Sequence, residues 1–281
     1  MLTRPGRRCG VLGDPIAHSL SPVLHRAAYA ELGLDWAYDA HRVAAGGLGD
    51  FLAGLGTEWR GLSLTMPLKR EALPLVDRLT DRARLAGAVN TVVLEDDGAR
   101  LGDNTDLPGA VAAVRERTSG PLATATILGG GATATSIGLA LADVGVRRIA
   151  VAVRDASRAT ETVAALRAHP AAPEVVVSPL HEGPGTAVDV VVSTIPASAQ
   201  TPELVSRCAD VPVVFDALYD PWPTPLVAAA GDRTVIGGLD LLVHQAVLQV
   251  ELFTGRIVAV DVLRDAGERA LAARRAGWMT P

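Results

Sequence analysis

Residues 123–153 read ATATILGGGATATSIGLALADVGVRRIAVAV, and this stretch decides the fold. The apolar and β-branched residues before the glycines at 129–131 predict a buried strand. After the glycines, apolar residues recur at helical spacing from Ile137, which predicts a helix that ends at Gly145. Residues 149–153 again have the composition of a buried strand. The stretch therefore predicts a βαβ unit of a doubly wound α/β domain.

A strand, a glycine turn and a helix in this order are typical of a dinucleotide site. The spacing from Gly129 to Ala134 is G-x-G-x-x-A, which lets backbone N–H groups at the helix start face a pyrophosphate. A plain tight turn also explains the glycines, but the complete βαβ setting favours the nucleotide. At the end of the second strand, Arg154 and Arg158 suit the 2′-phosphate of NADP, whereas Asp155 suits the ribose of NAD. We expect NADP rather than NAD, with a solvated helix start as the alternative explanation of the arginines.

Composition describes an ordinary α/β protein. The 281 residues are 49% hydrophobic and 20% charged, and the net charge of -5 argues against nucleic acid as a partner. No segment approaches the roughly 20 apolar residues of a membrane span, and the first residues lack a signal peptide. Cys9 and Cys208 stand far apart, and His18, His25 and His244 show no ligand spacing. We therefore expect a cytoplasmic protein with no metal site and structural histidines.

Polar side chains cluster near two predicted helix starts in the first hundred residues. Ser19 and Ser21 precede a helix, with Ser21 as its expected N-cap, and two hydroxyls beside free N–H groups suit a small carboxylate. A strand passes through Thr65 into a helix that begins near Pro67. Lys69 lies in the first turn of that helix, where the dipole opposes a cation and favours the neutral amine of a general base. Plain capping and a surface lysine remain the alternatives.

Two further motifs follow. Residues 87–91, GAVNT, lead into a strand, and a hairpin around Gly98 returns to residue 102. Asp106 then opens a helix to about Arg117, where a simple N-cap would also explain the aspartate.

Seven segments of the chain resemble, in order, the signature motifs of shikimate dehydrogenases. The matching segments are residues 13–25 (GDPIAHSLSPVLH), 63–69 (SLTMPLK), 87–91 (GAVNT), 102–106 (GDNTD), 192–196 (VSTIP), 215–226 (FDALYDPWPTPL) and 237–246 (GGLDLLVHQA). The resemblance covers nearly the whole chain. It implies an N-terminal α/β substrate domain over 1–106, a Rossmann-type NADP-binding domain over 107–238, and C-terminal helices over 239–281 that return to the first domain.

The resemblance also implies an activity and a set of site residues. The activity is the reversible, NADP-dependent reduction of 3-dehydroshikimate to shikimate in the biosynthesis of chorismate and aromatic amino acids. Lys69 would be the acid/base and Asp106 its partner. The substrate residues would be Ser19 and Ser21 for the carboxylate, Thr65, Asn90, Asp106 and Gln245 for the ring hydroxyls, and Tyr219 nearby. The cofactor residues would be Gly129, Gly130, Gly131, Ala132, Thr133, Arg154, Arg158, Thr194, Ala217, Gly238 and Leu241.

Several departures from the family pattern leave alternatives open. Val153 and Asp155 replace a common Asn and Thr, which leaves the choice between NADP and NAD open, while Leu241 replaces a frequent Met and should remain an apolar wall. A quinate/shikimate or aminoshikimate dehydrogenase fits the same residues. So does a catalytically silent NADP(H)-binding regulator, although the presence of Lys69 and Asp106 counts against it. Sequence does not set the oligomeric state, and a homodimer stays open.

Overall fold

The computed structural model describes residues 6–185 and 187–278, which form two compact units. Unit 1 comprises the described residues up to Arg84, Ala88–Thr105 and those from Leu242 onward. Unit 2 comprises Leu85–Gly87 and Asp106–Leu241. None of the helices in the described part of the chain combines the length and hydropathy that a membrane crossing requires.

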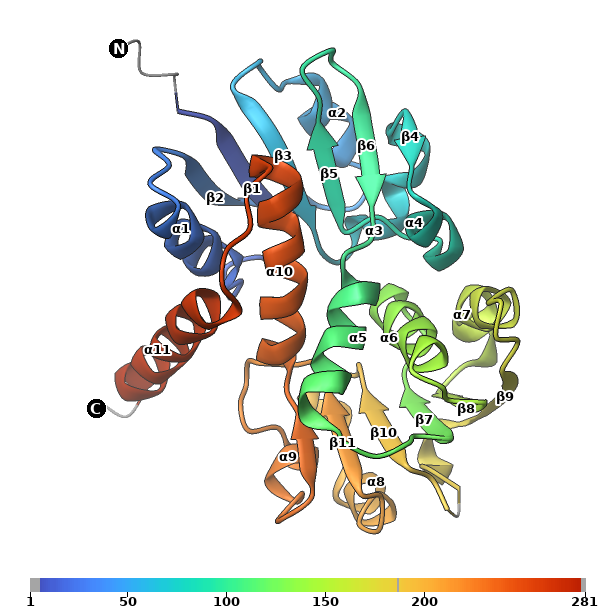
Figure 1. Ribbon diagram of the computed structural model, residues 1–281. Helices are drawn as coiled ribbons and strands as arrows, with labels where there is room; N and C mark the ends of the chain where they lie inside the picture. The colour runs from blue at the N-terminus through green and yellow to red at the C-terminus, as the bar shows by residue number, and fades with distance from the viewer. Residues whose placement is uncertain (1–5, 186, 279–281) are drawn as a thin grey trace. The chain divides into compact units, whose positions relative to one another are not determined.

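A six-stranded mixed sheet forms the centre of unit 1, in the order β2-β1-β3-β5-β6-β4 (Figure 1). Its strands are β1 (Arg8–Gly13), β2 (Ala37–Arg42), β3 (Trp59–Leu64), β4 (Arg78–Leu79), β5 (Thr91–Leu94) and β6 (Arg100–Asp103). β1 pairs in parallel with β2 and β3, whereas β5 is antiparallel to both β3 and β6. Gly98 in the turn between β5 and β6 has φ +88°, which favours glycine. The predicted hairpin is confirmed.

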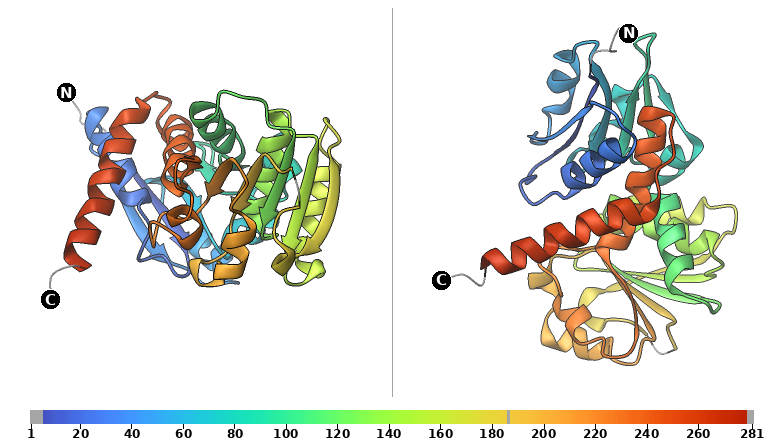
Figure 2. Two further views of the ribbon diagram at one scale, coloured as in Figure 1. Left: turned by 90° about the horizontal axis from the view of Figure 1, so that it is seen from below. Right: turned by 60° about the vertical axis from the view of Figure 1, so that its left-hand side comes forward.

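Helices cover both faces of this sheet. They are α1 (Ser21–Glu31), α2 (Leu48–Ala53), α3 (Leu68–Glu71), the 3-10 turn η1 (Leu73–Leu75), α4 (Asp81–Ala86), α10 (Gly238–Thr254) and α11 (Val260–Trp278). Leu62 and Leu64 of β3 belong to the apolar core that also contains Leu48 of α2. The alternate residue Gly61 faces α10, because a Cβ there would lie 2.1 Å from the Phe253 ring. α1 packs against α11 (Figure 2).

Unit 2 has a six-stranded parallel sheet in the order β12-β11-β10-β7-β8-β9 (Figure 1). Its strands are β7 (Thr124–Leu128), β8 (Arg148–Val153), β9 (Glu174–Pro179), β10 (Val190–Ser193), β11 (Val213–Asp216) and β12 (Thr234–Ile236). With β7 as the first strand, this is the order 3-2-1-4-5-6 of the dinucleotide-binding fold. The predicted α/β class and the βαβ unit at its centre are confirmed.

The sheet of unit 2 is buried on both faces by helices. They are α5 (Asp106–Arg117), α6 (Ala132–Asp143), η2 (Ala156–Ala159), α7 (Thr160–Arg167), η3 (Leu180–Glu182), η4 (Ala197–Ala199), α8 (Pro202–Arg207) and α9 (Pro225–Ala228). Val190 and Val192 of β10 pack with Ile137 of α6, whereas Val191 packs with Leu204 of α8. Alternate residues of one strand thus enter two separate cores, as its unbroken apolar run predicts.

Candidate active site

Lys69 follows the carboxyl end of β3. The backbone of Thr65 extends the parallel pairing, because its N–H donates to the Leu12 carbonyl at 2.9 Å. Leu68 then begins α3, and the carbonyl of Lys69 accepts a hydrogen bond from the Val89 N–H at 2.7 Å. α3 contains only four residues, so the helix-dipole argument that singled out Lys69 does not apply. The segment is held instead by its bond to the residue before Asn90.

Ser19 and Ser21 occupy the loop and helix start that follow β1. The prediction that Ser21 caps the helix is wrong: Leu20 already has helical backbone angles and occupies the N-cap position, so α1 begins at Ser21 itself. The oxygen that serves the helix start is Ser19 Oγ, which accepts from the Ser21 N–H at 3.3 Å. Thr65 and Gly13 touch at the neighbouring strand ends, since a Cβ on Gly13 would lie 2.4 Å from Thr65 Cγ2. The two serines, Thr65 and Lys69 therefore all follow the carboxyl ends of β1 and β3.

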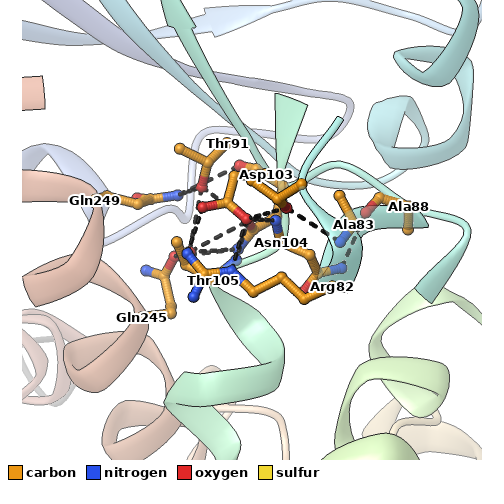
Figure 3. A network of polar contacts seen from close by, with 11 residues as sticks. Arg82, Ala83, Ala88, Thr91, Asp103, Asn104, Thr105, Gln245 and Gln249 are labelled. Atoms are coloured by element: carbon orange, nitrogen blue, oxygen red, sulfur yellow. Dashed lines mark hydrogen bonds and ion pairs between the residues drawn. The ribbon is translucent and has the colours of Figure 1, made fainter. Parts of the chain in front are cut away.

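Asn90 lies in a buried group of polar side chains that we call the polar cluster, and Figure 3 labels its other four members. Its members are Asn90, Thr91, Thr105, Gln245 and Gln249. Asn90 Oδ1 accepts from the Thr105 N–H and from Thr91 Oγ1, both at 2.8 Å. Asn90 Nδ2 donates to Thr105 Oγ1 at 2.9 Å and toward Gln245 Oε1 at 3.4 Å. The structure thus joins two predicted substrate residues, Asn90 and Gln245, in one network.

Three members of the polar cluster were missed by the sequence prediction. Thr91 and Thr105 each adjoin a predicted site residue within a quoted motif, but no role was assigned to them. Gln249 lies four residues after Gln245 on α10, and this spacing places two side chains on one helix face. The spacing was therefore the one local signal for Gln249.

Asp103 anchors the segment that leads to Asp106. Its carboxylate accepts from Arg82 Nε and from Thr80 Oγ1, both at 2.6 Å, and a second Arg82 nitrogen contacts the other oxygen (Figure 3). Burial raises the pKa of Asp103, but the bonds from Arg82 and Thr80 outweigh it, so the pKa lies below the ordinary value. Asp103 also accepts from the Asn104 N–H at 2.7 Å. This ionised anchor fixes the backbone of residues 103–105, and Asp106 then opens α5 in unit 2, where it is buried.

The glycines of unit 2 form a turn too crowded for side chains at its first two positions. Gly129 has φ +115°, and a Cβ there would lie 2.3 Å from Thr194 Oγ1. A Cβ on Gly130 would lie 2.8 Å from the Arg158 carbonyl oxygen. By contrast, the Cβ position of Gly131 meets no heavy atom within 4 Å beyond its chain neighbours, counting the described residues. The space before α6 is therefore open.

This geometry fits a bound dinucleotide phosphate. Gly131 occupies the N-cap of the 12-residue α6, and the first N–H groups of a helix have no partner within it. Ala132 and Thr133, the first helical residues, are half-buried. The close packing of Gly130 on the Arg158 backbone brings the predicted 2′-phosphate segment beside the turn, and Arg154 and Arg158 are both exposed. These residues could hold the pyrophosphate and 2′-phosphate of NADP.

Asp155 has a structural partner in its own turn. Its Oδ1 accepts from the Ser157 N–H at 2.9 Å and from Ser157 Oγ at 2.8 Å, so it caps η2. These hydrogen bonds lower the pKa of Asp155. The carboxylate that suggested NAD in the sequence is thus engaged by the chain.

The remaining predicted cofactor residues lie at the other strand ends of unit 2. Thr194 Oγ1 donates to the Leu128 carbonyl at 3.0 Å. Ala217 follows β11. A Cβ on Gly238 would lie 2.5 Å from the carbonyl oxygen of Ala217, so the start of α10 passes close to the loop after β11. Leu241 is buried in the core of unit 2, and Tyr219 is half-buried in the loop after β11.

Comparisons with known proteins agree with these features. The family model described as the shikimate dehydrogenase substrate binding domain matches residues 11–92, and that of the shikimate 5'-dehydrogenase C-terminal domain matches residues 238–266. A relative named shikimate dehydrogenase (NADP(+)) from Methylobacterium radiotolerans is 39% identical over 267 residues, which cover 88% of this chain and 91% of the relative.

Two solved structures of dehydrogenases are similar to this chain over nearly its whole length. The crystal structure of Mycobacterium tuberculosis shikimate dehydrogenase is similar with a TM-score of 0.83 and 42% identity, covering 95% of this chain and 99% of that one. A quinate dehydrogenase from Corynebacterium glutamicum, solved in complex with NAD, has a TM-score of 0.84 at 29% identity and covers 94% and 99% of the two chains. The chain belongs to the shikimate dehydrogenase family.

Proposed function

We propose that the protein is an NADP-dependent dehydrogenase that interconverts shikimate and 3-dehydroshikimate. The polar cluster of unit 1 carries the proposal. It holds the side-chain amides of Asn90 and Gln245, a group that can hydrogen-bond hydroxyls. The Val89 N–H donates to the Lys69 carbonyl, and this bond ties the segment that carries the Lys69 amine to the residues just before Asn90 and β5.

The proposed chemistry needs one proton transfer from the protein. When bound, NADP supplies the nicotinamide that accepts a hydride from the alcohol carbon. Lys69 takes the hydroxyl proton during oxidation and returns it to the forming alkoxide in the reverse direction. The Asp106 carboxylate would accept from Lys69 Nζ, orient the neutral amine and stabilise the ammonium that forms when it takes the proton. Ser19 and Ser21 bind the carboxylate, while Thr65, Asn90, Tyr219 and Gln245 orient the ring.

The preference for NADP follows from the turn after β8. Arg154 and Arg158 supply exposed guanidiniums, and Gly130 packs on the backbone of Arg158. Asp155 Oδ1 caps η2, and the two guanidiniums beside this carboxylate favour a 2′-phosphate over an unmodified ribose.

A quinate dehydrogenase is the second candidate. The similar Corynebacterium glutamicum structure is a quinate dehydrogenase in complex with NAD. Reduced-nicotinamide formation from shikimate, quinate and aminoshikimate, each with NADP and with NAD, decides between the candidates. We expect the highest kcat/KM for shikimate with NADP. Turnover mainly of quinate would replace the substrate, and no reduction in any combination would point to the silent regulator.

A further inference from the structure

The polar cluster continues into the core of unit 1 through side chains to which the proposed mechanism gives no function. Gln249 Oε1 accepts from Ser63 Oγ at 2.7 Å and lies 3.2 Å from His25 Nε2. Ser63 Oγ in turn accepts from the Tyr38 hydroxyl at 2.6 Å. We call His25, Tyr38, Ser63 and Gln249 the inner chain. All four are buried and come from four elements, α1, β2, β3 and α10.

The directions of the bonds that link Asn90, Thr91 and Gln249 follow from chemistry, whereas either hydroxyl can donate in the 3.2 Å contact between Thr91 Oγ1 and Thr105 Oγ1. A backbone N–H can only donate, so the bond from Thr105 N assigns the oxygen of the Asn90 amide to that side. The hydroxyl of Thr91 donates its one proton to Asn90 Oδ1 as well. Thr91 Oγ1 can therefore only accept from Gln249 Nε2, which lies 2.8 Å away. Gln249 Nε2 also donates to the Asn90 carbonyl at 3.3 Å, and this bond fixes the Gln249 amide independently.

The orientation of the Gln249 amide determines which ring nitrogen of His25 carries the proton. Because Gln249 Oε1 only accepts, His25 Nε2 must carry the ring proton. Burial lowers the pKa of His25 to about 3, against the hydrogen bond with Gln249, which raises it, so the ring is neutral at physiological pH. His25 Nδ1 finds no hydrogen-bond partner among the described residues. The ring lies flat against Tyr38, with centroids 4.0 Å apart.

The inner chain also approaches the predicted carboxylate residues. Burial raises the pKa of Tyr38 well above its ordinary value, and hydrogen bonds with Ser63 and Ser21 oppose that shift. Tyr38 is linked to Gln249 through Ser63, and Gln249 is linked to Thr91 and to the Asn90 carbonyl.

We propose that Gln249 and His25 are positioning residues, which hold the Asn90 amide in the one orientation that presents its nitrogen toward Gln245 and the substrate. The inference rests on the proposed function only in that the substrate binds at Asn90. Neither residue touches the reacting atoms. They act through Thr91: the bond from Gln249 Nε2 keeps the Thr91 proton on Asn90 Oδ1, where it holds the amide oxygen as a second donor beside the Thr105 N–H.

If these side chains only filled the core, apolar residues would do so at a lower cost in desolvation free energy. Each buried polar group loses its bonds to water, and the unpartnered His25 Nδ1 carries that cost with no compensating bond. An apolar core would also leave the Thr91 hydroxyl without the donor that directs its proton to Asn90 Oδ1. This cost is explained if the network serves orientation rather than stability.

Substitutions at Thr91 test the inference, because valine interrupts the network at nearly conserved volume and serine keeps the hydroxyl. Thr91→Val removes the hydroxyl, and Thr91→Ser retains it. Thr126→Val is the matched control, since Thr126 is a fully buried strand threonine of unit 2 whose Oγ1 has no hydrogen-bond partner among the described residues. Steady-state kinetics use whichever cyclic hydroxy acid the wild-type protein oxidises, so that a failure of the proposed substrate is detected separately in the wild type.

We expect Thr91→Val to raise KM for the hydroxy acid about tenfold, with KM for NADP unchanged and kcat changed less. Thr91→Ser should restore the wild-type KM, and Thr126→Val should leave both constants unchanged. If Thr91→Val does not fold, Gln249→Met interrupts the same network from α10 and should give the same KM-specific loss. An unchanged KM, an equal rise in KM for NADP, or a failure of Thr91→Ser to rescue would overturn the inference.

Discussion

The glycine turn of unit 2 and the polar cluster of unit 1 are built in opposite ways. The turn consists of consecutive residues, and its geometry depends on the absence of side chains at Gly129 and Gly130. The cluster consists of side chains from β5 and the residue before it, from α10 and from the segment after β6, and its geometry depends on matched donors and acceptors. A backbone site is therefore sensitive to added atoms, whereas a side-chain site is sensitive to a lost proton donor.

Adding one carbon to the turn should have the largest effect on stability. Gly129→Ala combines φ +115° with a Cβ 2.3 Å from Thr194 Oγ1, so we expect a loss of about 3 kcal/mol in unfolding free energy and loss of NADP binding. Gly145→Ala is the matched control, because Gly145 has φ +112° but no atom within 4 Å among the described residues. It should cost about 1–2 kcal/mol. Equal losses in denaturant unfolding would show that the contact with Thr194 is unimportant.

Removing the charge of the anchor should weaken the cluster. Asp103→Asn leaves Arg82 without its anionic partner, and we expect a loss of about 2 kcal/mol at neutral pH. Asp81→Asn is the control, since Asp81 pairs with Arg84 at the surface and should contribute less than about 1 kcal/mol.

The anchor also predicts a pH dependence. The pKa of Asp103 is lowered in the folded protein from its ordinary value of 3.8, so its stabilisation is complete above that value and is lost as the pH falls through the folded-state pKa. The stability difference between the wild type and Asp103→Asn should therefore shrink in acid. Urea unfolding across pH measures it, and a difference that grew below pH 4 would contradict the role of the ionised carboxylate.

Arg158 should contribute to the preference for NADP over NAD. Arg158→Ala should raise KM for NADP about tenfold and leave KM for NAD nearly unchanged, because only the 2′-phosphate needs the guanidinium. Arg148→Ala provides a control with another exposed arginine of the same unit, which pairs with Glu174. Equal changes for NADP and NAD would assign Arg158 to the pyrophosphate or to the fold.

The smallest effect is expected at Asp155. Asp155→Asn keeps an oxygen to cap Ser157 but removes a negative charge between two arginines, so KM for NADP should fall about twofold. A rise in KM for NAD in the same variant would instead mean that the carboxylate binds the ribose.

The same contrast explains how much of the molecule the sequence predicted. The βαβ unit could be predicted because its strand, glycines and helix are consecutive and each has a local pattern. Ser21 was misassigned as a cap because the sequence does not reveal that Leu20 already adopts helical angles. The dipole argument for Lys69 failed because a four-residue helix has no periodicity from which its length can be predicted.

The contacts of the inner chain could not be predicted from the sequence. His25 and Gln249 are separated by 224 positions, and only the packing of α1 and α10 on one sheet brings them together. His25 was expected to be structural because it has no ligand spacing. The structure adds that it is a neutral donor with one assigned tautomer.

Replacement of Lys69 tests the central claim most directly. Lys69→Ala should lower kcat for shikimate oxidation by about three orders of magnitude, since the proton then has no acceptor on the protein, while NADP still binds with wild-type affinity at the glycine turn. Both quantities can be measured on one preparation, by reduced-nicotinamide absorbance and by calorimetric titration. Turnover close to that of the wild type would remove Lys69 from the chemistry and contradict the account.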